Sequence, residues 1–141
     1  MEQLDLLRRV TEILEAMGLR YFVTGPTVTT YYGEPRFTND IDVVVDLSES
    51  QTADFCRQFP RDEFYLSDAA VQDAVRRKGQ FNIIHPASGL KVDVIVPDTS
   101  HFNQSRFSRA KPVRIGGDFD AIFASPEDAI NRRSQDQPGP N

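Results

Sequence analysis

The chain is 141 residues long, with 39% hydrophobic and 26% charged residues and a formal net charge of −5. This length and composition predict one globular domain that can bury its own core. The acidic balance argues against a general nucleic-acid-binding or membrane-binding surface, although it leaves room for a local basic groove.

The first residues and the cysteine content indicate the compartment. The start, MEQLDLLRR, lacks the apolar core of a signal peptide, and no apolar run is long enough to cross a bilayer. The single cysteine, Cys56, cannot form an internal disulfide, which favours a reducing compartment. We therefore expect a cytoplasmic protein without a membrane partner. Because Cys56 lies between Phe55 and Phe59 in a helical pattern, a buried thiol is favoured over a nucleophile.

Helices and strands alternate in the first half of the chain. Apolar residues recur at helical spacing from Leu4 to Met17, and the glycine that follows can end that helix. A short strand is expected from Arg20 to Thr24, and then a helix from Pro26 to Gly33. The valine-rich segment from Asp40 to Leu47 predicts a strand. A capping-box pattern starts the next helix, from Ser48 to about Phe59.

The second half predicts a further helix and a hairpin. Ser67 and Asp68 open a helix that ends near Gly79. Two strands, Phe81 to His85 and Leu90 to Val96, are joined by PASG and so predict a hairpin. A short helix is expected from about Ser100 to Phe107.

The C-terminal part predicts two short strands and a helix start. The strands are expected over Val113 to Ile115 and Phe119 to Phe123, and Ser125-Pro126-Glu127-Asp128 has the pattern of a helix N-terminus. We expect one domain over residues 1–133 and a disordered polar tail over residues 134–141. The order of elements predicts an α/β (α+β) fold, in which helices pack on a mixed β-sheet.

Two aspartates stand at the head of the strand DIDVVVDL. Because side chains alternate along a strand, Asp40 and Asp42 lie on one face, and Val43 and Val45 lie on the other. Two carboxylates on one face repel each other unless a cation lies between them. Mg²⁺ suits this arrangement, since it binds one or two carboxylates together with substrate phosphates.

A third aspartate interrupts the later apolar strand, LKVDVIV. Asp93 falls beside Ile95 on the face opposite to the valines, where a carboxylate is costly unless it is paired or bound to metal. If this strand lies next to the first, then Asp40, Asp42 and Asp93 converge. Three such acids are enough for a two-metal site that holds a nucleoside triphosphate and activates an acceptor hydroxyl.

The acids and histidines also fit other interpretations. Asp40 and Asp42 alone fit the solvated face of a sheet about as well as a metal site. A phosphatase-type Asp-x-Asp is disfavoured, because its acids end a buried strand whereas these begin one. His85 and His101 are too isolated to indicate zinc, and a turn histidine with a hydrogen-bond partner is favoured.

The segment YFVTGPTVTTYYGEPRFTNDIDVVVDL resembles the core of the nucleotidyltransferase superfamily. The similar members are small bacterial and archaeal ones, allied to the toxin component of AbiE-type toxin–antitoxin systems. Gly25 and the later Asp40-Ile41-Asp42 match the family's glycine and Asp-x-Asp, and GEPRFTNDID resembles its Gly-x-Pro-Arg-x-Thr-x-Asp-Ile-Asp. Val92-Asp93-Val94 falls where the third acid belongs, and ASPED resembles the start of the next family helix. The resemblance covers residues 1–133.

This resemblance implies Mg²⁺-dependent transfer of a nucleotidyl group from an NTP, with release of pyrophosphate. Two Mg²⁺ ions would be held by Asp40, Asp42 and Asp93, and Asp93 would also help to deprotonate the acceptor. Phosphate-binding roles follow for Gly25, which permits close backbone approach, and for Arg36, whose guanidinium fits a phosphate. Thr38 could orient Asp40. Arg36 as a turn residue bonded to backbone carbonyls is an equal alternative.

The sequence departs from the family pattern at two places. Pro26 stands where the family has Gly or Ser, so a backbone N–H and a hydroxyl that would bind triphosphate are missing, although Thr27 can supply a hydroxyl. At the other end, Arg133 takes the place of a usual Lys, and the family's closing helices are expected from another copy or a partner subunit.

Three hypotheses follow. The first is an active nucleotidyltransferase, related to toxin–antitoxin systems, that modifies an RNA or protein hydroxyl. The second is an inactive nucleotidyltransferase-like module that binds nucleotide, metal or a partner. The third is a structural domain that keeps only the sheet. Intact Asp40, Asp42 and Asp93 favour the first hypothesis, and Pro26 favours the second.

Overall fold

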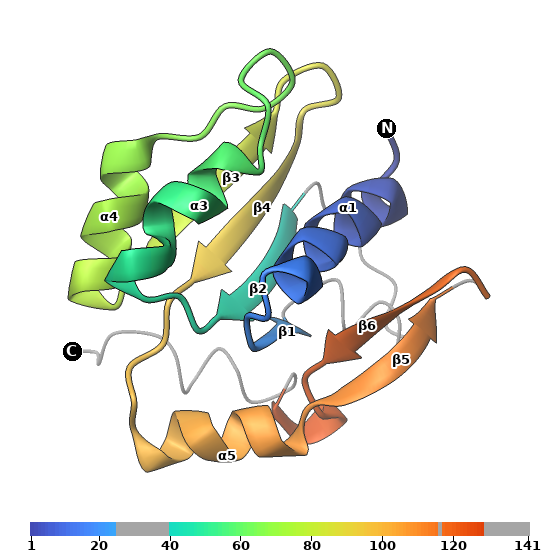
Figure 1. Cartoon of the computed structure of the whole chain (residues 1–141). Helices are drawn as coiled ribbons and strands as arrows, with labels where there is room; N and C mark the ends of the chain where they lie inside the picture. The colour runs from blue at the N-terminus through green and yellow to red at the C-terminus, as the bar shows by residue number, and fades with distance from the viewer. Residues whose placement is uncertain (25–39, 116, 129–141) are drawn as a thin grey trace, which may run out of the picture.

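A computed structural model describes residues 1–24, 40–115 and 117–128 of the chain (Figure 1). Within these ranges six strands form one mixed sheet, and helices pack against it. The predicted fold class is therefore confirmed. Among the described residues, no helix is both long and apolar enough to span a membrane.

The strand order in the sheet is β3-β4-β2-β1-β6-β5. Two neighbouring pairs are parallel, β2 with β4 and β1 with β6, and the other pairs are antiparallel. The predicted hairpin is the β3–β4 pair. A second hairpin, β5–β6, ends the sheet, and its edge position lets β5 tolerate Pro112, which has no N–H to donate. The strands are β1 Tyr21–Thr24, β2 Asp40–Val45, β3 Gln80–His85, β4 Leu90–Ile95, β5 Lys111–Ile115 and β6 Phe119–Phe123.

The helices start and end where local hydrogen bonds favour it. Ser67 caps α4 by accepting from the Ala70 backbone N–H at 3.1 Å, and Ser100 caps α5 through the N–H of Asn103 at 3.3 Å. Gly18 follows α1 with φ of +69°, a conformation that glycine adopts without strain. The helices are α1 Gln3–Ala16, α3 Thr52–Arg57, α4 Asp68–Arg77 and α5 His101–Arg109.

The single helix predicted from Ser48 to about Phe59 is divided in the structure. A 3₁₀ turn, η1 Glu49–Gln51, precedes α3. The expected capping box is present, with the Ser48 backbone N–H donating to Gln51 Oε1 at 3.0 Å. The helix stops before Phe59 because Pro60 follows, and the residue before a proline disfavours the helical conformation.

The two faces of the sheet bury different clusters. Ile41, Val43 and Val45 join the larger core with α1, α3 and α4, which lie in front of the sheet in Figure 1. On the opposite face, Val44 and Phe22 belong to a smaller cluster against which Phe107 of α5 packs. The prediction that Val43 and Val45 lie opposite to Asp40 and Asp42 is thus confirmed.

Several predictions fall outside the described residues. They are the helix from Pro26 to Gly33, the domain limit at residue 133 and the tail over residues 134–141. The predicted helix start is described as far as Asp128: the chain becomes helical at Pro126, and Ser125 Oγ accepts from the Asp128 backbone N–H at 3.2 Å.

Candidate functional site

A row of polar residues crosses four neighbouring strands of the sheet. Thr24 of β1 is the register partner of Asp42 of β2, and Asp42 is the partner of Asp93 of β4. Asp93 is in turn the partner of Asn82 of β3. Register partners in neighbouring strands project their side chains from the same face. We call these four residues the polar row, and it lies on the face that also carries α5.

The two acids of the polar row are placed by strand pairing. Val43, Val44 and Val45 of β2 are buried, as is Val94 of β4, and the two strands pair in parallel from Asp40 opposite Lys91 to Val44 opposite Ile95. β2 and β4 therefore lie next to each other, which is the arrangement that lets their aspartates share one surface. Asp42 is 8% exposed, and Asp93 is half-buried, so both carboxylates sit where solvent screens them only in part.

The outer members of the row differ in their hydrogen bonding. The Asn82 side-chain amide donates to Asp93 Oδ1, which fixes one oxygen of that carboxylate. Thr24 is fully buried, and among the described residues its Oγ1 has no hydrogen-bond partner. A buried hydroxyl is normally paired, so an unsatisfied one requires an explanation.

Asp40 lies two residues before Asp42 on β2, and its side chain projects from the same face of the sheet. Its register partner on β4 is Lys91, and the Lys91 Nζ lies 3.9 Å from Asp40 Oδ1. Lys91 therefore places a positive charge next to the first acid of the Asp-x-Asp pair. The Gln3 side-chain amide of α1 also donates to the Asp40 backbone carbonyl, at 3.4 Å.

The residue types of the polar row suit a hard divalent cation. Mg²⁺ prefers oxygen ligands such as carboxylates. Here Asp42 and Asp93 are neighbours in the sheet, and the hydroxyl of Thr24, next to Asp42, has no hydrogen-bond partner among the described residues. In the described part of the chain, however, no group of three or more His, Cys, Asp or Glu side chains is arranged to hold a metal. The three-carboxylate ligand set with Asp40 therefore stays a prediction.

The predicted phosphate-binding residues lie outside the described ranges. These are Gly25, Thr27, Arg36 and Thr38, together with Pro26, the main departure from the family pattern. In the sequence, this segment begins directly after Thr24, the last residue of β1. The polar row is thus the part of the candidate site that the structure describes.

Three residues of the site were not singled out from the sequence. Asn82 alternates with the buried Phe81 and Ile83, and this period-two pattern was the available signal for its face. Lys91 carries the same kind of signal in LKVDVI, whereas YFVT is buried throughout and shows no alternation that would mark Thr24. Only the register shows that these side chains stand next to Asp42, Asp93 and Asp40, because alternation assigns a face without assigning a neighbour.

The predicted helix start at Ser125 is anchored close to the polar row. β6 runs parallel to β1, and the Ala124 backbone N–H donates to the Val23 carbonyl at 2.9 Å, so residue 125 follows the sheet beside Thr24. Asp128 accepts two bonds from Arg109 of α5, at 2.9 and 2.7 Å. Burial alone would raise the pKa of Asp128, but the bonds from Arg109 and Ser125 outweigh it and lower the pKa.

A buried cation borders the polar row on the α5 side. Arg106 is 3% exposed, and its guanidinium lies 4.9 Å from the ring centroid of Phe22, two residues before Thr24 on the same strand. Arg106 also donates to Asn103 Oδ1 at 3.1 Å. A guanidinium in this position contributes positive potential to the face that carries Asp40, Asp42 and Asp93.

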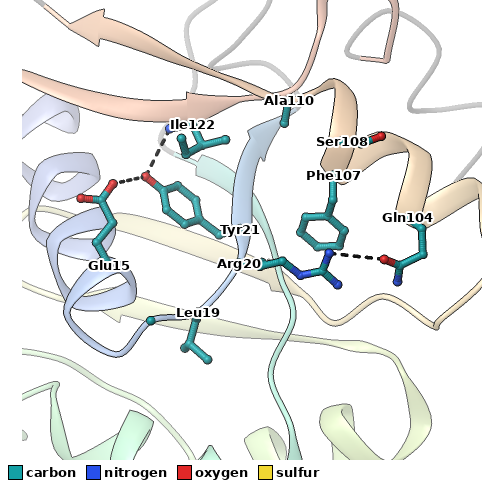
Figure 2. A pocket seen from close by; sticks show the side chains of 10 residues that line it. Glu15, Leu19, Arg20, Tyr21, Gln104, Phe107, Ser108, Ala110 and Ile122 are labelled. Carbon is teal, nitrogen blue, oxygen red and sulfur yellow. Dashed lines mark hydrogen bonds between the residues drawn. The ribbon is translucent and has the colours of Figure 1, made fainter.

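A separate pocket of about 710 Å³ lies at the opposite end of β1 from Thr24 (Figure 2). Tyr21 donates to Glu15 Oε2 at 2.7 Å and accepts from the Ile122 backbone N–H at 3.2 Å, while Arg20 donates to Gln104. Burial and the bond to Glu15 raise the pKa of Tyr21. None of the described residues of the polar row lines this pocket, whose walls are Glu15, Gly18, Leu19, Arg20, Tyr21, Gln104, Phe107, Ser108, Ala110 and Ile122.

Two other residues discussed from the sequence have structural partners. His85 Nδ1 lies 2.7 Å from Ser88 Oγ in the β3–β4 turn, as expected for a turn histidine. Cys56 is buried, and burial is the main reason that its pKa is raised to about 11. A thiol of this kind is inert at neutral pH, which agrees with the predicted packing role.

The known proteins that resemble this chain do so in structure. No family model and no curated protein matches the sequence. The lincosamide antibiotic adenylyltransferase LnuA, solved with lincomycin, aligns over 100% of this chain and 89% of its own, with a TM-score of 0.61 and 11% identity. TM1012 from Thermotoga maritima, assigned as a nucleotidyltransferase, aligns over 96% of this chain and 86% of its own, with a TM-score of 0.56 and 16% identity. The chain therefore has the mixed α/β fold of these nucleotidyltransferase structures.

Proposed function

We propose that this protein is a Mg²⁺-dependent nucleotidyltransferase that moves a nucleotidyl group from an NTP to a hydroxyl of an RNA or a protein. The observation that carries the proposal is the register of Asp42 with Asp93 on the parallel strands β2 and β4. The shared fold of LnuA, which is named an adenylyltransferase, supports the reaction class. The resemblance to toxin-allied family members supports a macromolecular acceptor.

The residues of the polar row have complementary roles in this proposal. Asp42 and Asp93 would hold Mg²⁺, together with Asp40, and the bound ion would neutralise charge on the triphosphate. The acceptor oxygen forms a bond to the α-phosphorus, the bond from that phosphorus to the bridging oxygen breaks, and pyrophosphate leaves. The acceptor proton passes to the Asp93 carboxylate, whose orientation the Asn82 amide maintains.

Residues outside the described ranges complete the proposal. Gly25, Thr27 and Arg36 would contact the phosphates, and Thr38 would orient Asp40. These assignments follow from the resemblance and from the position of the segment directly after β1. Pro26 removes one backbone donor from the phosphate loop, so a larger share of triphosphate binding would fall on Thr27 and Arg36.

A second candidate function is a nucleotide-binding or partner-binding module without transfer activity. The observation that favours it is the ion pair between Lys91 Nζ and Asp40 Oδ1 at 3.9 Å. The positive charge of Lys91 partly neutralises the Asp40 carboxylate, so less negative charge is left to bind a second metal ion. Under this alternative, Asp42 and Asp93 still bind one cation, and the chemistry is absent.

Two measurements on the purified chain separate these functions. The first measures the Tm of the protein with Mg²⁺ and each of the four NTPs in turn. Both candidate functions predict that Tm rises with Mg²⁺ and at least one NTP. The second follows transfer of label from [α-³²P]NTP to RNA and protein in a cell lysate, with Asp93→Asn as the inactive control. Transfer by the wild type alone supports the enzyme. Binding without transfer supports the module, and no rise in Tm at millimolar ligand contradicts both.

A further inference from the structure

Thr24 differs from the other buried threonines in the described part of the chain. Thr11 donates from its hydroxyl to the Arg8 carbonyl at 3.1 Å, and Thr52 donates to the Glu49 carbonyl at 3.0 Å. Thr24 is fully buried, yet its Oγ1 has no partner among the described residues. Burial of an unsatisfied hydroxyl lowers stability, so a fold has no structural reason to retain one where valine would fit.

The position of Thr24 indicates what the hydroxyl faces. Its register partner across the β1–β2 pair is Asp42, and the next residue along the row is Asp93. Directly opposed side chains on one face have Cβ atoms about 4.5–5.5 Å apart. The hydroxyl is therefore next to the carboxylate pair and on the same side of the sheet.

We propose that the Thr24 hydroxyl faces the ligand of this site and hydrogen-bonds a water molecule in the hydration shell of a divalent cation held by Asp42 and Asp93. This inference rests on the proposed function, which supplies the cation. Mg²⁺ and Mn²⁺ retain several waters when only one or two carboxylates bind them. A hydroxyl can accept a hydrogen bond from such a water while donating to a carboxylate oxygen, which would satisfy Oγ1 in the loaded protein.

Replacement of Thr24 by valine separates this role from a structural one. Valine has the same shape without the hydroxyl, so the metal-free Thr24→Val protein should melt about 2–6 °C higher than the wild type in EDTA. The same variant should bind Mn²⁺ about tenfold more weakly, as measured by water-proton relaxation during titration. Thr24→Ser keeps the hydroxyl and should bind Mn²⁺ with nearly wild-type affinity.

Thr11→Val is the matched control, because it also removes the hydroxyl of a buried threonine. The Thr11 hydroxyl has a partner, so this variant should melt lower than the wild type and bind Mn²⁺ unchanged. A higher Tm for Thr24→Val and a lower Tm for Thr11→Val would support the inference without any measurement of activity.

Several outcomes would overturn the inference. If Thr24→Val binds Mn²⁺ as tightly as the wild type, the hydroxyl does not face the cation, and the proposed function stands without it. If Thr24→Val melts lower or does not fold, the hydroxyl has a structural partner. A loss of affinity seen only when NTP is present would assign the hydroxyl to a phosphate instead of a water. If the wild type binds no Mn²⁺, with or without NTP, both this inference and the proposed function fail.

Discussion

Asp42 of β2 and Asp93 of β4 are directly opposed in a parallel strand pair, with Asp42 almost fully buried. Like charges in directly opposed positions of a sheet are unfavourable, by about 0.2–1 kcal/mol relative to neutral pairs. Binding a cation removes this repulsion. Without metal, the protein should therefore be less stable when both Asp42 and Asp93 are charged than when only one of them is.

Asp42→Asn should consequently keep or raise the Tm of the metal-free protein, by the equivalent of up to about 1 kcal/mol, while abolishing nucleotidyl transfer. The stabilisation by Mg²⁺ and NTP should also be lost. Thermal melts in EDTA and in Mg²⁺ with NTP measure both effects. Asp120→Asn is the control, because Asp120 is exposed and pairs with Arg114 on the surface. A loss of metal-free stability confined to Asp42→Asn would assign that carboxylate a structural role.

Asn82 is expected to act on the cation through Asp93. Because its amide donates to Asp93 Oδ1, Asn82→Ala should leave that carboxylate free to rotate and weaken Mn²⁺ binding by about tenfold. Since Asn82 is exposed, the change in unfolding free energy should stay within about 0.5 kcal/mol. Gln80→Ala removes an exposed amide two residues away on the same face and should bind Mn²⁺ normally. Equal affinities for the two variants would contradict the positioning role.

The Arg109–Asp128 pair should make stability depend on pH at the acid end. Since the pKa of Asp128 is lowered in the folded protein, the pair stabilises the fold above the unfolded pKa of about 3.9 and loses this effect as the pH falls through the folded pKa. Arg109→Met should therefore lower Tm clearly at pH 7, and the difference from wild type should shrink towards pH 3. Melts between these two pH values measure it.

Arg114→Met is the control for that experiment, because Arg114 and Asp120 form an exposed pair with side chains 61% and 57% accessible. It should change Tm little at either pH. A difference between wild type and Arg109→Met that stays constant from pH 7 to pH 3 would mean that the contribution of Arg109 does not depend on the charge of Asp128.

The hydroxyl of Tyr21 joins α1 to β6. It donates to Glu15 and accepts from the backbone N–H of Ile122, so Tyr21→Phe leaves two polar groups without their partner. We expect a loss of about 1–2 kcal/mol in the free energy of unfolding, measured by urea denaturation. Tyr65 is 61% exposed, and Tyr65→Phe is the matched control with no expected change. Equal stabilities of the two variants would show that solvent satisfies these groups without the hydroxyl.

Local patterns predicted most elements of the fold. The alternation in DIDVVV and LKVDVI assigned Asp42 and Asp93 to faces that the structure confirms, because successive side chains of a strand point to opposite faces of the sheet. Caps at Ser67 and Ser125 were also predictable, since a hydroxyl that bonds a nearby N–H is a local interaction. The division of the helix after Ser48 was missed, because a 3₁₀ turn and a short α-helix share the same start signal.

The candidate site was only partly predictable. The three aspartates were found because carboxylates in apolar strands are conspicuous, whereas Thr24 and Asn82 look ordinary in their own segments. The significance of Thr24 depends on the absence of a partner for Oγ1 among the described residues, and a sequence does not show which hydroxyls are satisfied. Lys91 was missed because its neighbour Asp40 is 51 positions away in the chain, and a sequence does not show which distant residues meet.

The sequence by itself determined which side chains lie on which face of each strand, and so which acids could share a surface. The tertiary structure alone decided that β2 lies between β1 and β4, and that Asp42 stands level with Thr24 on one side and Asp93 on the other. The physical reason is that alternation is a property of one strand, whereas order and register result from packing between segments far apart in the chain.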